Sequence, residues 1–188
     1  MPEHSELRDE SLELVIEESE VAFKGRVWDV RRETFDYGGH PITREFVDHP
    51  GAVAVLALDE NDNALLIQQY RHPIRMREWE LPAGLLDVEN EPPLDAARRE
   101  LAEEADLVAE HWTELIDFHT SPGGSNEVLR IYLARGLSDA DLPYGRAEEE
   151  ADILVKWVPM AEIVAGILEH RLHNSILIVA VLAAHARA

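Results

Sequence analysis

The chain of 188 residues contains no cysteine. Disulfide bonds, zinc sites built from thiolates and cysteine nucleophiles are therefore excluded. A long apolar run is also missing, because the longest one, Ile176 to Ala184, falls far short of the roughly 20 residues that a membrane-spanning helix needs. Met1 to Glu10 is polar and acidic and does not show the pattern of a secretory signal. We therefore expect a cytoplasmic protein that does not contact membranes.

Basic residues are scarce, with 17 Lys and Arg against 38 Asp and Glu and a net charge of −21. A surface of this sign repels phosphate backbones, so we expect no nucleic-acid partner. It also disfavours an anionic small substrate unless cations lie between the acids and the phosphate. Most of the acids are expected to form a solvated surface. Any cluster of acids that does bind an anion therefore points to a metal site.

Short apolar segments separated by turn residues dominate the first two thirds of the chain. Residues 12–48 alternate and are rich in β-branched side chains around a turn at Asp36 to Pro41, which predicts a hairpin or small antiparallel sheet. A second hairpin is predicted from Val53–Leu58 and Ala64–Gln69 around a turn at 59–63. Further strands are expected at 79–81, 115–119, 128–134 and 152–158, and helices at 92–105, 160–169 and 175–188. This order predicts an α+β fold in which helices pack on a mixed sheet.

Three carboxylates lie on one side of the helix that Pro92 and Pro93 are expected to open. At 100° per residue, the apolar stripe that faces the core consists of Leu94, Ala97, Leu101 and Ala105. Glu100 and Glu104 lie beside this stripe and Glu103 lies a little further round, whereas a solvated face would put its acids opposite the stripe. Glu100 and Glu104 are like charges at i,i+4, a spacing that destabilises an isolated helix. As ligands of Mg²⁺ or Mn²⁺, however, these carboxylates become useful. The arginines next to them are expected to point elsewhere, although Arg99 can brace Glu103 at i+4.

At this point the sequence resembles the Nudix box, the signature of hydrolases that cut nucleoside diphosphates linked to another group. Glu91, Arg99 to Glu104 and Leu107 match the box in register. Two departures are visible: the spacing from Gly84 to Glu91 is one residue longer than in the family, and Asp106 stands where the family has Gly. The Gly position ends the helix in the left-handed region, which Asp tolerates better than most residues.

Outside the box the chain resembles the ADP-ribose pyrophosphatase branch of the family. The resemblance rests on segments 69–71, 79–84, 121–127, 148–153 and 174–175. It implies an α/β/α sandwich for residues 49–188, the catalytic domain. It also implies that residues 1–48 form an antiparallel β segment that makes an intertwined homodimer and helps to build each active site.

By this resemblance, Mg²⁺ or Mn²⁺ would be held by Glu100 and Glu104, with Glu103 beside them as ligand or catalytic group and the Ala83 carbonyl as a further ligand. Arg71 would contact the diphosphate, since an arginine fork suits phosphate oxygens. The alternative for Arg71 is a surface cation that pairs with one of many nearby acids.

The resemblance implies less specific roles for four other residues. Glu127 would contact the ribose end of the substrate, and Trp28 and Glu45 would hold adenine across the dimer. A glutamate of the 148–150 run, Glu149 or Glu150, would orient or deprotonate the attacking water. The alternatives are an ordinary loop acid for Glu127, core or dimer packing for Trp28, and a solvated loop tip for the acidic run.

The expected reaction is metal-dependent hydrolysis of ADP-ribose to AMP and ribose 5-phosphate. Three alternatives remain open. The first is a Nudix hydrolase of another nucleoside diphosphate derivative, such as a nucleotide sugar, NADH or a dinucleotide polyphosphate, or of a nucleoside triphosphate. The second is a nucleotide-sensing domain that binds without hydrolysis, and the third is a purely structural acidic protein. The complete set of box carboxylates argues against a sensor, which would usually have lost one of them.

Overall fold

The structure is a computed structural model that describes residues 6–140 and 153–187. It divides into two compact units, one made of Met1–His49 with Gly123–Ser125 and the other of Pro50–Pro122 with Asn126–Ala188. In the described part of the chain, no helix is both long enough and apolar enough to cross a membrane. The cytoplasmic location expected from the sequence stays a prediction.

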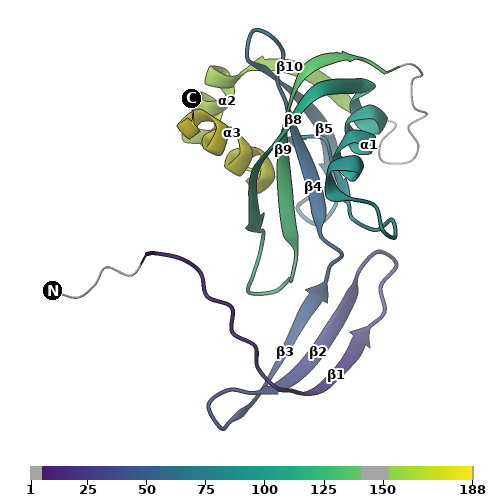
Figure 1. Cartoon of the computed structure of the whole chain (residues 1–188), viewed down its shortest axis with the longest axis vertical. Helices are drawn as coiled ribbons and strands as arrows, with labels where there is room; N and C mark the ends of the chain where they lie inside the picture. The colour runs from purple at the N-terminus through teal and green to yellow at the C-terminus, as the bar shows by residue number, and fades with distance from the viewer. Residues whose placement is uncertain (1–5, 141–152, 188) are drawn as a thin grey trace, which may run out of the picture. The chain divides into compact units, whose positions relative to one another are not determined.

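The first unit is an antiparallel sheet of three strands in the order β1-β2-β3 (Figure 1). Strand β1 spans Ile16–Phe23, β2 spans Asp29–Asp36 and β3 spans Pro41–Asp48. The predicted turn from Asp36 to Pro41 is confirmed, and the carboxylate of Asp36 accepts a hydrogen bond of 3.0 Å from the amide of Gly39. Within this unit, the amide of Val47 also donates to the carbonyl of Gly124.

The predicted small antiparallel sheet is confirmed, but it starts later than residue 12, because β1 begins only at Ile16. The acidic residues that follow Ile16 did not suggest a strand by themselves. One of them, Glu20, has an arginine opposite it in β2: Arg32 lies opposite Glu20 in register, and its Nη1 bonds Glu20 Oε1 at 3.1 Å. Every residue of β1 is exposed, so polar cross-strand contacts such as this ion pair stabilise the strand in place of burial.

The second unit contains two sheets. The four-stranded sheet has the order β7-β4-β9-β8, and the three-stranded one has the order β10-β5-β6. Their strands are β4 Ala52–Ala57, β5 Asn63–Arg71, β6 Met76–Glu80, β7 Ala83–Leu85, β8 Leu107–His119, β9 Val128–Asp139 and β10 Leu154–Pro159. Strands β4 and β9 are parallel, and the other pairs are antiparallel, so the predicted mixed sheet is confirmed.

The predicted second hairpin is wrong. Both of its strands exist, but β4 and β5 belong to different sheets and do not pair along their length. An isolated bridge between Leu58 and Ala64 joins the residues next to the turn. The turn between them is present, since Asp59 accepts hydrogen bonds from the amides of Asn61 and Asn63, both at 2.8 Å. Each strand is apolar on both faces and lies between two other strands, β4 between β7 and β9 and β5 between β10 and β6. Closeness in the sequence therefore did not predict which strands pair.

Helices cover both faces of strands β4 and β9 (Figure 1). Helix α1 (Pro93–Ala105) lies on one face, and α2 (Met160–Leu168) and α3 (Ser175–Arg187) lie on the other. Alternate residues of β4 divide between two cores. Val53 and Val55 pack with α1, whereas Ala54 and Leu56 pack with α2 and α3. The α/β/α sandwich is therefore confirmed.

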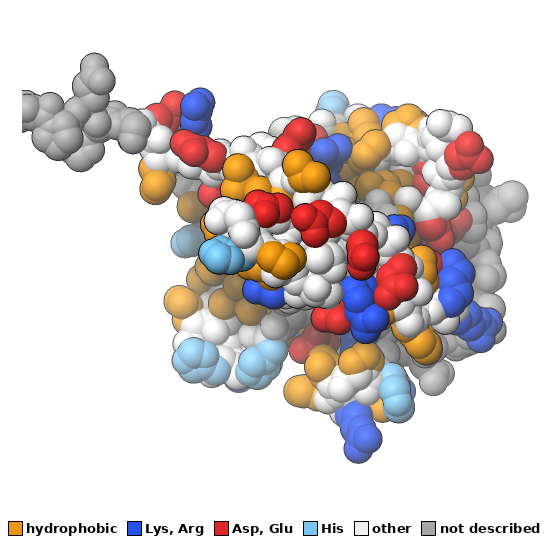
Figure 2. Space-filling model, turned by 90° about the horizontal axis from the view of Figure 1, so that it is seen from below, with side chains coloured by type: hydrophobic (Ala, Val, Ile, Leu, Met, Phe, Trp, Pro, Cys, Tyr) orange, Lys and Arg blue, Asp and Glu red, His pale blue; other side chains and the backbone are white. Residues whose placement is uncertain are grey.

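The acidic surface is mixed rather than uniform. On the face drawn in Figure 2, acidic side chains lie among Lys, Arg and apolar side chains. Several acids form exposed ion pairs, such as Asp95 with Arg98 at 2.9 Å, a type of pair that contributes little to stability. This agrees with the expectation that most of the acids form a solvated surface.

Candidate active site

Helix α1 begins and ends where its sequence predicts. Pro92 is the N-cap in an extended conformation, with φ −63° and ψ 142°, and Pro93 opens the first turn. The helix ends at Asp106, whose φ of 55° and ψ of 33° are left-handed, and whose amide donates to the carbonyl of Ala102 at 3.0 Å. The predicted left-handed aspartate is thus confirmed.

The order of the carboxylates around α1 also follows the prediction. Ala97 and Leu101 are fully buried in the core. Glu104 beside them is only 5% exposed. The side chains of Glu100 and Glu103 are 12% and 36% exposed, respectively. The acids therefore form a graded edge of the core, with Glu104 deepest, and do not form an outward face.

Glu104 is fixed by the backbone at the start of β7. Its Oε2 accepts a hydrogen bond of 2.8 Å from the amide of Ala83. Strand β7 itself is held by β4, with Ala83 opposite Ala54 in register. Two of the predicted metal ligands, Ala83 and Glu104, are therefore neighbours, although many residues separate them in the chain.

Glu100 lies directly against the backbone of Gly84. A Cβ atom built on Gly84 would fall 2.0 Å from Cδ and Oε1 of Glu100, a distance that no side chain can have. The φ of Gly84 is not positive, so its backbone conformation does not require glycine. Glycine is needed here because only a residue without a Cβ lets the Glu100 carboxylate lie this close to the backbone. The structure brings Ala83, Gly84, Glu100 and Glu104 to one place at the contact between α1 and β7.

Arg99 lies at the centre of the acidic edge. Its Nη1 bonds Glu100 Oε1 at 2.5 Å and Glu103 Oε2 at 3.2 Å, and its Nε and Nη2 bond Glu91 at 3.1 and 3.0 Å. The predicted brace to Glu103 is confirmed, but the expectation that the arginine points away from the cluster is wrong. A long side chain reaches well beyond the direction of its Cα–Cβ bond, which is all that a helical wheel shows.

This ion-pair cluster shifts two pKa values. The hydrogen bond to Glu91, together with the charges of Glu100 and Glu91, raises the pKa of Arg99. The same hydrogen bond lowers the pKa of Glu91 from its ordinary value. Both groups therefore stay charged at neutral pH, and Arg99 neutralises part of the repulsion among the helix carboxylates.

The carboxylates suit a hard divalent cation in chemical type. Within residues 6–140 and 153–187, no three Asp, Glu, His or Cys side chains are arranged as a complete metal cage. Oxygens of Glu100 and Glu103 bond Arg99 instead. Mg²⁺ commonly takes one or two carboxylates together with water and substrate phosphates, so a partial set of protein ligands fits this ion.

Arg71, the predicted diphosphate contact, forms a fork with a buried carboxylate. Its Nε bonds the two oxygens of Glu80 at 2.9 and 3.2 Å, and its Nη2 bonds Glu80 Oε2 at 2.6 Å. The Arg71 side chain is 44% exposed and that of Glu80 only 3%. Glu80 therefore orients the guanidinium from its buried side, while part of the Arg71 side chain is exposed to solvent.

The remaining predicted substrate residues have local partners. Half-buried Glu127 accepts a hydrogen bond from the hydroxyl of Thr120. In the first unit, Glu45 Oε1 accepts a hydrogen bond of 2.9 Å from Arg32 Nε. The ring centroids of Trp28 and His49 are 5.4 Å apart. None of these contacts tests the predicted roles. Glu149 and Glu150 lie outside the described residues.

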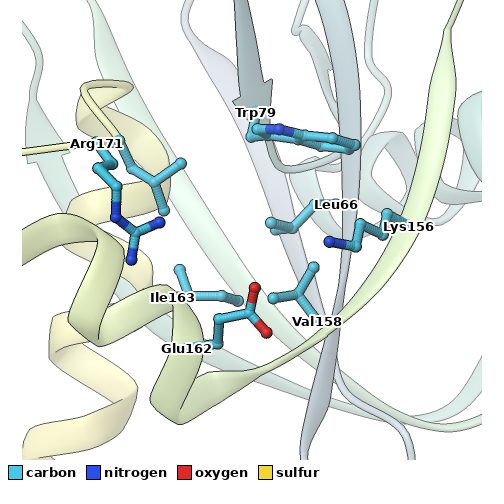
Figure 3. Close-up of a pocket in the computed structure, with 8 residues that line it drawn as sticks. Leu66, Trp79, Lys156, Val158, Glu162, Ile163 and Arg171 are labelled. Atoms are coloured by element: carbon cyan, nitrogen blue, oxygen red, sulfur yellow. The ribbon is translucent and has the colours of Figure 1, made fainter.

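A cavity of about 240 Å³ lies where α2 packs against strands β5, β6 and β10. Trp79, Lys156, Glu162 and Arg171 surround it (Figure 3). Its apolar lining, including Leu66 and Ile163, belongs to the core that packs with α2 and α3, opposite α1. None of the predicted site residues lines it, so it is separate from the carboxylates of α1.

A model of the NUDIX domain family matches residues 48–177, which is more than half of the chain. The chain belongs to the Nudix family. Helix α1 and its approach from Gly84 are therefore the Nudix box. A solved structure described as an ADP compounds hydrolase has a TM-score of 0.77 and 22% sequence identity over 95% of this chain and 96% of its own. That similarity shows the fold alone.

Two curated relatives cover most of this Nudix chain. The ADP-ribose pyrophosphatase of Mycobacterium tuberculosis (strain ATCC 25618 / H37Rv) is 47% identical over 169 residues, which are 89% of this chain and 81% of that protein. The methanol dehydrogenase activator of Bacillus methanolicus is 36% identical over 164 residues, which are 87% of this chain and 88% of that protein.

Sequence reasoning missed two residues of this site. The sequence indicates Glu80 only as part of the segment that leads into the Nudix box, and it predicts Arg99 only as a brace for Glu103. A signal for Glu80 was present, because a lone acid between Trp79 and Leu81 in a strand is expected to need a cation. Which cation it meets depends on the pairing of β5 with β6.

Proposed function

We propose that this chain hydrolyses the diphosphate bond of ADP-ribose, with Mg²⁺ or Mn²⁺, to give AMP and ribose 5-phosphate. The observation that carries the proposal is the contact between α1 and β7, where Glu100 and Glu104 lie against Gly84 and Ala83. The choice of substrate is supported by 47% identity to an ADP-ribose pyrophosphatase, against 36% to the methanol dehydrogenase activator.

Glu100 and Glu104 would hold the ion, with Glu103 beside them and the carbonyl of Ala83 as a further ligand. When bound, the ion would offset the charge of the diphosphate and lower the pKa of a coordinated water. Arg71 would donate hydrogen bonds to phosphate oxygens, held in position by Glu80. Glu149 or Glu150 would accept the proton of the attacking water.

We further propose that two copies of the chain form a homodimer through the first unit, with Trp28 and Glu45 gripping adenine and Glu127 the ribose end. The exposed apolar side chains of this unit support a partner, since Phe23 is 64% exposed and Trp28 46%. Light scattering coupled to size exclusion should give twice the mass of one chain. A monomeric mass at assay concentration would contradict the dimer.

The function is tested by comparing turnover of ADP-ribose, NADH, GDP-mannose and dGTP with Mg²⁺ and with Mn²⁺. We expect ADP-ribose to have the highest kcat/KM, with AMP and ribose 5-phosphate as the products by chromatography. A higher kcat/KM for another compound would support a hydrolase whose substrate is that compound and not ADP-ribose. Binding of ADP-ribose without cleavage, with either ion present, would favour the sensing domain.

A further inference from the structure

The carboxylate of Glu80 is one of the most deeply buried charged groups in the described part of the chain, at 2% exposure. A buried carboxylate is costly unless a cation and hydrogen bonds compensate for it. The hydrogen bonds described for Glu80 all come from Arg71. For stability alone, an apolar residue at this position would serve as well or better.

The geometry of the pair restricts the guanidinium more than a single contact would. Three N–H···O bonds of 2.6 to 3.2 Å join Nε and Nη2 of Arg71 to both oxygens of Glu80. A fork on a fork fixes the plane of the guanidinium as well as its position. Since 44% of the Arg71 side chain is exposed, burial alone does not fix its orientation.

Glu80 also ties Arg71 to the carboxylate edge of α1. It ends β6 and is followed at once by the segment that carries Ala83 and Gly84. The carbonyl of Pro82 in this segment accepts a hydrogen bond of 2.9 Å from the amide of Val55 in the central strand β4. One short stretch of backbone therefore positions Arg71 through Glu80, Glu104 through Ala83, and Glu100 through Gly84.

We propose that Glu80 is a positioning residue that sets the orientation of the Arg71 guanidinium towards the diphosphate of the substrate. This rests on the proposed function, in which Arg71 contacts that diphosphate. Because the negative charge of Glu80 offsets the positive charge of Arg71, the pair presents directed N–H donors rather than a strong attractive field. Its loss is therefore expected to affect kcat more than KM.

The test is a double-mutant cycle of Glu80→Gln and Arg71→Gln, with kcat and KM measured for ADP-ribose and Mg²⁺. Glu80→Gln alone should lower kcat/KM by about 10- to 100-fold, since small misplacements of a positioned group have effects of this size. In the Arg71→Gln background the same change should have less than about a twofold effect, because its target is gone. Glu78→Gln, two residues earlier in β6, is the matched control and should retain full activity.

A loss from Glu80→Gln that is equally large without Arg71 would overturn the proposal, as would wild-type kinetics in that variant. Melting temperatures show whether each variant is folded in the assay. If Glu80→Gln does not fold, Glu80→Asp, which keeps the charge on a shorter arm, takes its place. If Arg71→Gln does not fold, Arg71→Lys, which removes the fork, takes its place.

Failure of the proposed function would look different. A wild-type chain that leaves ADP-ribose uncut refutes the function and still allows the cycle to be measured as calorimetric binding of inorganic pyrophosphate with Mg²⁺. The same coupling is then expected in the dissociation constants. Independent effects of the two substitutions on that constant would overturn the role of Glu80.

Discussion

The amide of Ala83 donates a hydrogen bond of 2.8 Å to Oε2 of Glu104, which joins the first residue of β7 to the last turn of α1. The bond holds a carboxylate that is 5% exposed in a fixed place. It also brings the peptide group of Ala83 next to the acidic edge of the helix. The Nudix box therefore acts as a contact between a helix and a strand, and the helix alone does not make the site.

Replacing Glu104 by Gln should abolish metal-dependent turnover and leave the fold intact. The amide oxygen of Gln can still accept the hydrogen bond from Ala83, but the charge that binds a cation is lost. We expect a larger loss of kcat than the roughly 10- to 100-fold that follows removal of an outer partner of a metal site. Glu110→Gln, an exposed change on β8, is the control. Near-normal turnover of Glu104→Gln with Mg²⁺ would refute the ligand assignment.

Replacing Gly84 by Ala should damage activity more than stability. The added Cβ would meet the end of the flexible Glu100 side chain, which can swing away at small cost. Displacing this carboxylate should weaken Mg²⁺ dependence and lower kcat/KM by about tenfold or more. Thermal melting should change little. Gly123→Ala, where a Cβ meets nothing within 4 Å, should leave both measurements unchanged. Equal effects at the two glycines would show that the approach of Glu100 does not matter.

The effect of substituting Asp106 on the free energy of unfolding should depend on how well the new residue tolerates the left-handed backbone. Ala, whose Cβ is unfavourable there, should lower the free energy of unfolding relative to Gly by about 1 kcal/mol. The carboxylate of Asp106 also lies at the negative end of the helix dipole, so Gly should equal or exceed the wild type. Urea denaturation of the three proteins measures this order. An alanine variant as stable as the glycine variant would contradict it.

The Glu91–Arg99 pair should make stability depend on acid pH. Its hydrogen bond lowers the pKa of Glu91 below 4.5, so folding favours the ionised form. The stabilisation is therefore present above the unfolded value and is lost as the pH falls through the folded one. Urea titrations of the wild type and Glu91→Gln between neutral and acid pH should show a gap that closes below about 4.5. A gap that stays constant with pH would mean that the pair does not contribute through its charge.

Local patterns in the sequence predicted α1 well. Prolines at its start, a residue that tolerates the left-handed region at its end and an apolar stripe are all properties of adjacent residues, and each was confirmed. Local patterns did not predict which strands pair or where β8 begins. The apolar runs of β4 and β5 predicted a hairpin, but β4 pairs with the distant β9, and β8 starts at Leu107 rather than at Leu115. Strand β7 has only three residues and depends on β4 for its existence.

The sequence by itself determined which residues could carry the chemistry: three glutamates on one edge of a helix, in a chain with no cysteine and with few basic side chains. Tertiary structure alone decided what those glutamates meet. Glu100 lies against Gly84, Glu104 accepts from Ala83, and Arg71 is held by Glu80 because sheet pairing brings distant segments together. Helical periodicity is a local property that residue order encodes directly. Contacts between segments depend on which strands pair and how closely backbones approach, and these follow from the packing of the whole core.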